Sequence, residues 1–392
     1  MHRLNALLGM PQHRFASIHV VGTNGKSSVT RMTAAILDAH GVAAGALVSP
    51  HLEHWSERIV IGGENIGSDA FAAAIGRAAE AAEVVGRSLG EAVTQFEVAT
   101  AAGFLALAAA RVRVGVIEAG LGGRLDATNT IPSRVTVLTS VGLDHTEWLG
   151  ETEEEIAAEK LAVLRDHTTL VLGRVSAPVR ELAERTAAER GADLVQAPED
   201  PGEQIVLGAR GRFQRRNLAL ARAAAEAFHG PLDPELVAAA AAGVTVPGRL
   251  ELVADDPPIF LDAAHNVDAA AALAEALPEV VGPGPVTACL AMLADKDAAG
   301  AIAALVPVLE RVVCTEIPDE TLHSQGRPGA SAHPAAELAR ICRAEGLEAE
   351  AEPNLVDALA RASELASASP GGTLLITGSH YLLAPARTML SR

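Results

Sequence analysis

A short apolar run over residues 18–21 leads into a turn with the sequence Gly22-Thr-Asn-Gly-Lys-Ser-Ser28, and apolar residues then recur at helical spacing up to Leu37. A strand, a glycine-containing turn and a helix are typical of a phosphate cradle, because helix N-terminal N–H groups point at the anion and Lys26 adds a positive charge. The match to the pattern G-x-x-x-x-G-K-[ST] is partial, since Val20 occupies the first glycine position. The alternative is an ordinary strand-to-helix turn with one exposed lysine.

The composition is that of a globular protein with an acidic surface. The chain has 392 residues, 49% of them hydrophobic and 20% charged, which is enough for two domains. Its net charge of -18 argues against nonspecific binding to nucleic acid or to an anionic membrane, where a basic surface is expected. An anionic small molecule remains a compatible partner, because a local basic pocket can exist in an acidic protein.

The cysteines and the N-terminus favour a cytoplasmic protein. No pair among the three cysteines has the spacing of a metal site, which predicts buried, reduced thiols at Cys289, Cys314 and Cys342. No signal peptide is recognisable, and the alanine-rich runs are too short and too interrupted to span a bilayer. We therefore expect a soluble chain in the cytoplasm.

Strand-like and helix-like segments alternate along the first 244 residues. Strands are predicted at 18–21, 42–48, 114–117, 135–141, 169–172 and 194–195, with a hairpin over 58–66. Helices are predicted at 68–85 (capped by Ser68 or Asp69), 94–110, 152–164, 213–228 and 234–242. This order predicts an α/β fold with a doubly wound, mostly parallel sheet and helices on both faces.

Polar residues follow the ends of the first predicted strands. Because parallel strands end at one edge of such a sheet, four side chains can converge there: Lys26, Ser49, Glu118 and His145. A lysine, a hydroxyl and a carboxylate beside a phosphate cradle suggest a nucleotide–magnesium site, since Mg²⁺ prefers oxygen ligands; an imidazole is a less usual ligand. Taken singly, Ser49 can end a strand, Glu118 can cap a loop and His145 can belong to a turn.

The pattern restarts after a segment rich in glycine and proline, residues 243–248. This predicts a first domain over 1–244 and a smaller, Rossmann-like α/β domain over 245–392. In the second domain, strands are predicted at 259–261, 286–292, 311–315 and 373–377, helices at 298–306, 334–345 and 355–366 and one ending near Leu277, and a polar loop at 323–332.

Ten motifs occur in a fixed order along nearly the whole chain. They are Gly22-Thr-Asn-Gly-Lys26, Ser49-Pro-His-Leu52, Glu57-Arg-Ile59, Glu118-Ala-Gly-Leu-Gly-Gly-Arg-Leu-Asp-Ala-Thr-Asn129, Gly142-Leu-Asp-His145, Glu159-Lys160, Pro247-Gly-Arg-Leu-Glu251, Leu261-Asp-Ala-Ala-His-Asn266, Leu293-Ala-Asp-Lys-Asp297 and Thr377-Gly-Ser379. Together they resemble folylpolyglutamate synthase and its bifunctional bacterial form, which is also a dihydrofolate synthase, in the Mur ligase superfamily. The resemblance implies a central domain of the Mur ligase type that binds ATP and folate, and a C-terminal ligase domain that binds glutamate and closes the cleft.

The resemblance also implies roles for single residues. The ATP phosphates would be held by Gly22, Thr23, Asn24, Gly25, Lys26, Ser27 and Ser28. Ser49 and Glu118 would hold one Mg²⁺ and His145 a second, while Lys160 matches a lysine that is carbamylated in the family. Without the resemblance, Lys160 is interpreted as a solvated helix residue paired with acidic neighbours.

Further positions match the substrate sites of the family. Asn217 and Arg249 match nucleotide-contacting residues, and Asp262 and His265 match residues near ATP and the incoming glutamate. The pterin substrate would lie against Thr94, Gln95, Phe96, Glu97, Leu125, Asp126 and Ala127. The chain departs from the family at Ser27, where glycine is usual, so the composition of the Mg²⁺ shell stays open; it also departs at Trp55-Ser56 and Leu161-Ala162.

The implied activity is an ATP-dependent acid–amino-acid ligase acting through an acyl phosphate. Its small-molecule substrates would be ATP, L-glutamate and a folate or dihydropteroate, and the enzyme would be a monomer. One alternative is a Mur ligase of cell-wall synthesis, but the strand at Ile18 leaves too little chain before it for the extra N-terminal domain that is common there. The other alternative is a P-loop regulatory protein, in which Arg249, Asp262 and His265 would have no evident purpose.

Overall fold

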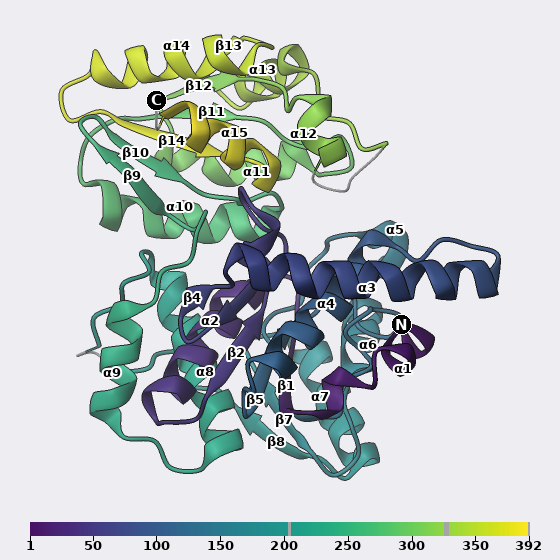
Figure 1. The fold of residues 1–392 in the computed structure, drawn as a ribbon. Helices are drawn as coiled ribbons and strands as arrows, with labels where there is room; N and C mark the ends of the chain where they lie inside the picture. Colours follow the sequence, from purple (N-terminus) through teal and green to yellow (C-terminus); the bar gives the residue numbers. More distant parts are fainter. Residues whose placement is uncertain (203–204, 325–328, 391–392) are drawn as a thin grey trace. The chain divides into compact units, whose positions relative to one another are not determined.

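The computed structural model describes residues 1–202, 205–324 and 329–390 (Figure 1). The chain forms two compact units, the first made of Met1–Gly208 and Gln214–Thr245 and the second of Ala209–Phe213 and Val246–Arg392. Each unit is an α/β structure with its own sheet, so the mixed, mostly parallel α/β fold class predicted from the sequence is confirmed.

The first unit is built on an eight-stranded sheet with the order β4-β3-β2-β5-β1-β6-β7-β8. All neighbouring pairs are parallel except β2–β3 and β3–β4, and the β3–β4 pair is the hairpin predicted over 58–66. The central strand β1 is almost fully buried, as its run of apolar residues predicts. The strands are β1 (Ala16–Val21), β2 (Ala44–Leu47), β3 (Ile59–Ile61), β4 (Glu64–Asn65), β5 (Val114–Glu118), β6 (Ser133–Leu138), β7 (Thr169–Leu172) and β8 (Asp193–Gln196).

The helices of the first unit largely follow the predicted segments. Capping boxes begin α4 at Thr94 and α6 at Thr152, each with a glutamate three residues later that bonds back to the cap. The helices are α1 (His2–Leu7), α2 (Lys26–Ala39), α3 (Ser68–Leu89), α4 (Gln95–Ala109), α5 (Thr146–Leu149), α6 (Glu153–Leu161), α7 (Ala177–Arg190), α8 (Arg212–His229) and α9 (Pro234–Gly243), with 3₁₀ turns η1 (Pro11–His13) and η2 (Trp55–Arg58).

Two helix predictions needed correction. The α3 helix begins after Gly67 rather than after a Ser68 or Asp69 cap, and it continues to Leu89, where Gly90 ends it in the left-handed conformation. It is the long helix that packs beside α4 in Figure 1. The α6 helix is shorter than predicted and ends at Leu161.

The second unit contains a six-stranded sheet with the order β13-β12-β11-β14-β10-β9. Every neighbouring pair is parallel except β9–β10. Two edge strands, β9 (Glu251–Asp255) and β13 (Glu348–Ala351), escaped prediction, because charged and alanine residues interrupt their apolar pattern. The other strands are β10 (Pro258–Leu261), β11 (Val286–Leu290), β12 (Arg311–Cys314) and β14 (Thr373–Thr377).

The helices of this unit cover both faces of its sheet (Figure 1). The strand predicted last in the chain, at 373–377, is β14, and a final helix that was not predicted follows it. The predicted loop at 323–332 begins inside α12, and its residues 325–328 lie outside the described part of the chain. The helices are α10 (Val267–Val281), α11 (Ala298–Leu305), α12 (Asp319–Ser324), α13 (Ala335–Ala344), α14 (Leu355–Ser367) and α15 (His380–Leu390), with the 3₁₀ turn η3 (Val306–Val308).

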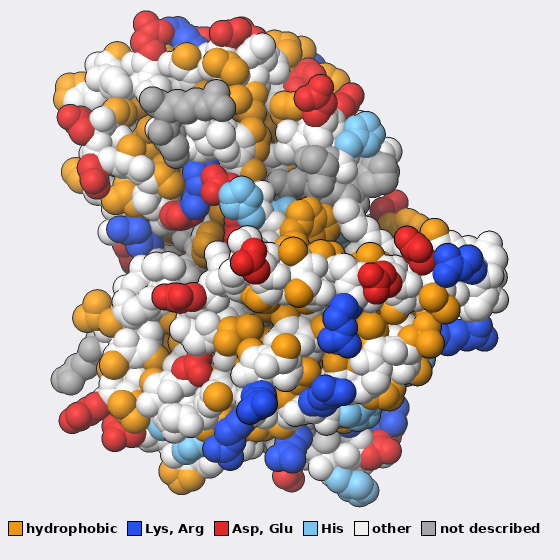
Figure 2. Space-filling view, in the orientation of Figure 1, with side chains coloured by type: hydrophobic (Ala, Val, Ile, Leu, Met, Phe, Trp, Pro, Cys, Tyr) orange, Lys and Arg blue, Asp and Glu red, His pale blue; other side chains and the backbone are white. Residues whose placement is uncertain are grey.

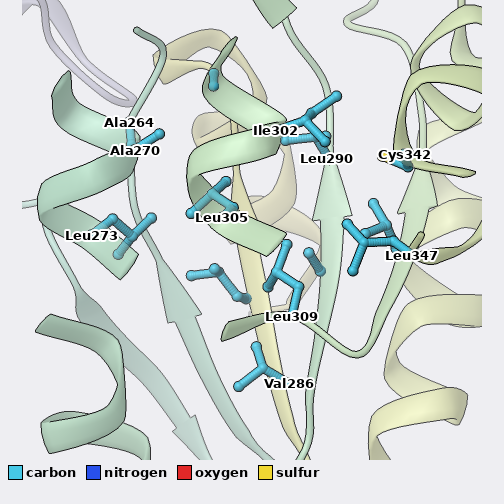
Figure 3. Packing of buried hydrophobic residues seen from close by; sticks show 14 of the residues in the cluster. Ala264, Ala270, Leu273, Val286, Leu290, Ile302, Leu305, Leu309, Cys342 and Leu347 are labelled. Carbon is cyan, nitrogen blue, oxygen red and sulfur yellow. The ribbon is translucent and has the colours of Figure 1, made fainter. Parts of the chain in front are cut away.

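The core of the second unit consists of small and medium aliphatic side chains. Figure 3 shows Ile302 of α11 beside Leu290 of β11, with Leu305 of the same helix pointing into this packing. All three cysteines are buried and free, as predicted, and the sulfur atoms of Cys314 and Cys342 lie 3.8 Å apart.

The surface of each unit carries acidic and basic side chains among apolar ones on the face shown in Figure 2. In the described part of the chain, no helix combines the length and the apolar character that crossing a bilayer requires.

Candidate active site

The phosphate-cradle motif forms the turn between β1 and α2, as predicted. A Cβ atom added to Gly22 would lie 1.9 Å from Thr139 Oγ1, and one added to Gly25 would lie 2.6 Å from Asn217 Oδ1. Both glycines also have positive φ angles, 150° and 83°. Val20 lies inside β1, so the partial match to the motif leaves the turn itself intact. The structure therefore places Asn217, predicted to contact nucleotide, directly against this turn.

Two lysines converge on one carbonyl oxygen of this turn. Lys26 Nζ donates to the carbonyl oxygens of Gly22 and Thr23 at 3.0 and 3.1 Å, and Lys160 Nζ donates to that of Gly22 at 3.1 Å. Lys160 is 3% exposed, so its interpretation as a solvated helix residue is wrong. Burial, and then the positive charge of Lys26, lower the pKa of Lys160 to about 7.

A buried carboxylate at the end of β5 contacts Ser27, the residue after Lys26. Glu118 is 3% exposed. Its Oε1 accepts a hydrogen bond from Ser27 Oγ at 2.9 Å, and its Oε2 accepts one from the backbone N–H of Ser49 at 3.0 Å. The structure thus brings together three of the four residues predicted to meet at this edge, and it adds the hydroxyl of Ser27.

The fourth residue, His145, lies on a neighbouring loop. It has a left-handed backbone conformation and precedes α5. Thr23 fastens this loop to the phosphate turn, because its hydroxyl exchanges hydrogen bonds with the backbone of Gly142. Nε2 of His145 lies 3.8 Å from a carboxylate oxygen of Asp144. Among the residues described, no three His, Cys, Asp or Glu side chains gather around a common point to hold a metal ion.

Sequence reasoning missed two hydroxyls that hold the phosphate turn. Thr139 Oγ1 and Ser140 Oγ donate to the carbonyl oxygen of Asn24 at 2.6 and 3.2 Å, and Ser140 Oγ also accepts the N–H of Asn24. Both residues directly follow β6, on the same edge as Glu118. Ser49 and Glu118 were selected because polar residues at the ends of parallel strands meet at one edge of the sheet. Thr139 and Ser140 also follow a buried parallel strand, so the same reasoning could have found them.

The first segment predicted to bind the pterin, 94–97, lies against the start of the loop that carries the second, 125–127. A Cβ atom on Gly120 would come within 2.4 Å of the ring of Phe96, so the ring covers the start of the loop after β5. At the tip of that loop Leu125 is 92% exposed, whereas its neighbour Asp126 is largely buried and burial raises its pKa. Thr94, Gln95 and Glu97 occupy the capped first turn of α4 beside Phe96, and Ala127 is buried.

A cluster on the loop after Ser49 was also missed. Arg58 Nε donates to Nδ1 of His51 at 2.9 Å, and the Arg58 guanidinium lies 4.2 Å above the centre of the Trp55 ring. Burial, followed by the charge of Arg58, lowers the pKa of His51 to about 4. Trp55 had been singled out only as a departure from the family pattern.

The remaining candidates lie in the second unit. Both oxygens of Asp262 accept backbone N–H groups, those of Leu250 and Ala264, at 2.8 Å each. Asp262 is 3% exposed, and burial raises its pKa against the lowering effect of Arg249. Nδ1 of His265 lies 2.7 Å from the carbonyl oxygen of Ala263 and therefore carries a proton. In the neutral ring, Nε2 is then the nitrogen without a proton.

Comparison with known proteins identifies the family. The model of the Mur ligase middle domain matches residues 20–189, and that of the Mur ligase glutamate ligase domain matches residues 248–380. A dihydrofolate synthase/folylpolyglutamate synthase of Mycobacterium tuberculosis is 36% identical, over 98% of this chain and 88% of the relative. The chain belongs to the folylpolyglutamate synthase/dihydrofolate synthase family. This membership favours an enzyme of that family over the cell-wall ligase and the P-loop regulator.

Solved structures of folylpolyglutamate synthases have the same fold. The Mycobacterium tuberculosis folylpolyglutamate synthase complexed with ADP is 34% identical and superposes with a TM-score of 0.90, covering 100% of this chain and 94% of that one. A bifunctional folylpolyglutamate synthase/dihydrofolate synthase with Mn, AMPPNP and L-glutamate bound is 26% identical, with a TM-score of 0.83, and covers 100% of this chain and 94% of that one.

Proposed function

We propose that this chain is an ATP-dependent ligase that joins L-glutamate to the γ-carboxylate of a tetrahydrofolate and to the benzoate carboxylate of dihydropteroate. The observation that carries the proposal is the meeting of Lys26, Lys160 and Glu118 with Ser27 around one glycine turn. Membership of the folylpolyglutamate synthase/dihydrofolate synthase family supports it.

The first chemical step transfers the γ-phosphoryl group of ATP to the acceptor carboxylate and releases ADP. A free carboxylate is a poor electrophile, and the acyl phosphate that forms has phosphate as its leaving group. The backbone N–H groups of residues 22–28 would hold the ATP phosphates, and Lys26 would move from its carbonyl partners to the charge that builds up in transfer. Asn217, placed against Gly25, would contact the nucleotide.

The donor set around Glu118 fits Mg²⁺. Carboxylate and hydroxyl oxygens from Glu118, Ser49 and Ser27 are hard ligands, and the buried carboxylate already has an N–H group and a hydroxyl directed at it. When bound, Mg²⁺ supplies charge neutralisation for the transferring phosphoryl group. We assign His145 to a second Mg²⁺, because Thr23 ties its loop to the phosphate turn.

Carbamylation of Lys160 is part of the proposal. Carbamate formation requires a neutral amine, which attacks CO₂ and loses a proton. The lowered pKa of Lys160, about 7, leaves a large neutral fraction at physiological pH. The product would carry an anionic oxygen in place of the cation. Incubation with ¹³C-bicarbonate should give a carbamate carbon signal by NMR that is absent from Lys160→Met; no signal from the wild-type protein would refute this assignment.

The second step is the attack of the glutamate amine on the acyl phosphate. We assign its binding and deprotonation to Asp262 and His265 in the second unit, with Arg249 on the nucleotide. Nε2 of His265 is the nitrogen with which it would accept a proton, because Nδ1 already donates to a carbonyl. Residues 94–97 and 125–127 would hold the pterin ring of the acceptor, and Phe96 offers an aromatic face beside the loop.

The test is glutamate-dependent release of ADP from Mg-ATP, with tetrahydrofolate and dihydropteroate assayed in parallel. Release with both supports the bifunctional enzyme, and release with one defines a single activity. Lys26→Ala should abolish release while the circular-dichroism spectrum stays unchanged, because the hydrogen bonds of Lys26 to the described residues go to two carbonyl groups of the turn. Release with neither acceptor, or full activity of Lys26→Ala, would overturn the proposal.

A further inference from the structure

A buried histidine in the middle of β1 takes no part in the proposed ligase mechanism. His19 is fully buried between β5 and β6. Its Nε2 lies 2.8 Å from Thr128 Oγ1, and its Nδ1 has no hydrogen-bond partner among the residues that the structure describes. Burial lowers the pKa of His19 to about 3, with a smaller contribution from Arg165, so the ring is neutral at physiological pH.

The direction of each hydrogen bond follows from the neighbours of Thr128. Its hydroxyl lies 2.5 Å from Asp126 Oδ1, and a carboxylate oxygen accepts, so the hydroxyl proton points at Asp126. The Thr128 oxygen must therefore accept from His19, which places the ring proton on Nε2. The opposite tautomer would bury an N–H group at Nδ1 without an acceptor, which costs more free energy than burying an unpaired acceptor nitrogen.

The chain of hydrogen bonds ends on the carboxylate that shapes the exposed loop. Asp126 Oδ1 accepts the N–H of Thr128 at 2.9 Å, and Oδ2 accepts that of Leu121 at 2.9 Å. Asp126 thereby closes the turn from Leu121 to Asp126. Leu125, within this turn, is 92% exposed. A carboxylate held on one side only could rotate about its side-chain bonds and release the Leu121 N–H.

We propose that His19 and Thr128 are positioning residues, which act through Asp126 to hold the loop 120–127 in the shape that receives the pterin end of the substrate. The proposal rests on the assignment of this loop to the pterin under the proposed function. We call the hydrogen-bonded series His19–Thr128–Asp126 the relay. His19 lies in the central strand β1 and Asp126 in the loop, so the relay fixes the surface loop to the rigid sheet.

Matched pairs of variants test the relay. Thr128→Val removes the hydroxyl and keeps the shape, and Thr128→Ser keeps the hydroxyl. His19→Met removes the donor, and His19→Gln can supply an amide N–H of similar reach. We expect Thr128→Val and His19→Met to raise KM for tetrahydrofolate or dihydropteroate about 10-fold, with kcat and KM for ATP within about twofold. Thr128→Ser and His19→Gln should recover most of this loss, and the double variant Thr128→Val/His19→Met should be no worse than either single one.

Two measurements test the relay without catalysis. Selective ¹⁵N-histidine NMR of the wild-type protein should show His19 protonated at Nε2, and hydrogen exchange at the Leu121 amide should be faster in Thr128→Val than in Thr128→Ser. The proposal would be overturned if His19 carried its proton on Nδ1, or if the Leu121 amide exchanged equally fast in Thr128→Val and Thr128→Ser. It would also be overturned if the substitutions raised KM for the pterin substrate and KM for ATP alike and lowered kcat. If the wild-type protein uses neither pterin substrate, the proposed function fails alone, and the tautomer and exchange data still decide whether the relay exists.

Discussion

Lys26 and Lys160, from two different helices, donate to the same carbonyl oxygen, that of Gly22, at 3.0 and 3.1 Å. Two ammonium groups on one acceptor repel each other, and only Lys160 is largely excluded from water. Burial, with the repulsion added to it, lowers the pKa of Lys160. Lys26 keeps a second acceptor, the carbonyl oxygen of Thr23.

Lys160→Met is expected to stabilise the protein while it abolishes ligase activity. The folded-state pKa of Lys160, about 7, lies below its ordinary value of 10.5, so the unfolded chain binds the extra proton between these pH values. The free energy of unfolding of the wild-type protein should therefore rise with pH from 7 to 10.5. The variant should be more stable at pH 7 by about 2–4 kcal/mol. Urea unfolding in CO₂-free buffer at pH 7 and pH 10 measures both effects; a variant less stable than wild type at pH 7 contradicts the prediction.

Glu118→Gln is expected to weaken binding of the metal–nucleotide complex. The substitution removes the negative charge and turns an NH₂ group toward either the Ser27 hydroxyl or the Ser49 N–H. We expect a loss of at least about 100-fold in Mn²⁺ affinity in the presence of nucleotide, measured by electron paramagnetic resonance. Ser27→Gly removes a neutral hydroxyl and no charge, so it should cost less than about 10-fold. Unchanged Mn²⁺ affinity in Glu118→Gln would place the metal elsewhere.

Gly22→Ala is expected to disrupt the phosphate turn. The new methyl group would lie 1.9 Å from Thr139 Oγ1, and Thr139 is one of the side chains that fix the Asn24 carbonyl. We expect a loss of about 2–3 kcal/mol in stability and loss of ATP binding. Gly62→Ala is a matched control with a φ of 60° and no atom within 4 Å of the added carbon, so it should cost only about 1 kcal/mol and leave ATP binding intact. Thermal unfolding with and without nucleotide separates the two variants.

His19 is expected to make the protein sensitive to acid. Its pKa in the folded state, about 3, lies below its ordinary value of 6.5, so stability is lost as pH falls from 6.5 toward 3. Between pH 6.5 and 5 the loss from this group is about 2 kcal/mol. In His19→Met the difference in unfolding free energy between pH 7 and pH 5 should be smaller by that amount, measured by urea titration. An unchanged difference would mean that the pKa of His19 is not lowered in the folded protein.

The strands of both sheets were predictable wherever they are buried on both faces. Strands such as β5 and β14 are nearly continuous apolar runs, because helices cover the two sides of a parallel sheet. The edge strands β9 and β13 were missed because charged and alanine residues interrupt their apolar pattern. Helix ends were less predictable than helix centres: α3 passes Val85, the predicted end, and stops only at the left-handed Gly90.

The candidate site was predictable to the extent that it lies at strand ends. The edge rule brought together Lys26, Ser49 and Glu118 before any coordinate was known. Helical periodicity could not indicate that Lys160 is buried, because its surroundings come from the distant Gly22 turn. His19 was hidden for a similar reason: a polar residue inside an apolar strand shows no partner in the sequence, and Thr128 is 109 positions away.

The scarcity of aromatic residues has a practical consequence. The chain contains two tryptophans and one tyrosine, and both tryptophans lie in short helical segments next to loops of the candidate site. Trp55 is in contact with His51 and Arg58 on the loop after Ser49, while Trp148 is 72% exposed on α5 beside the His145 loop. Intrinsic fluorescence therefore reports on these two loops with little background from the rest of the protein. The single replacements Trp55→Phe and Trp148→Phe would leave one emitter each, so ordering of either loop by a ligand can be followed without a label.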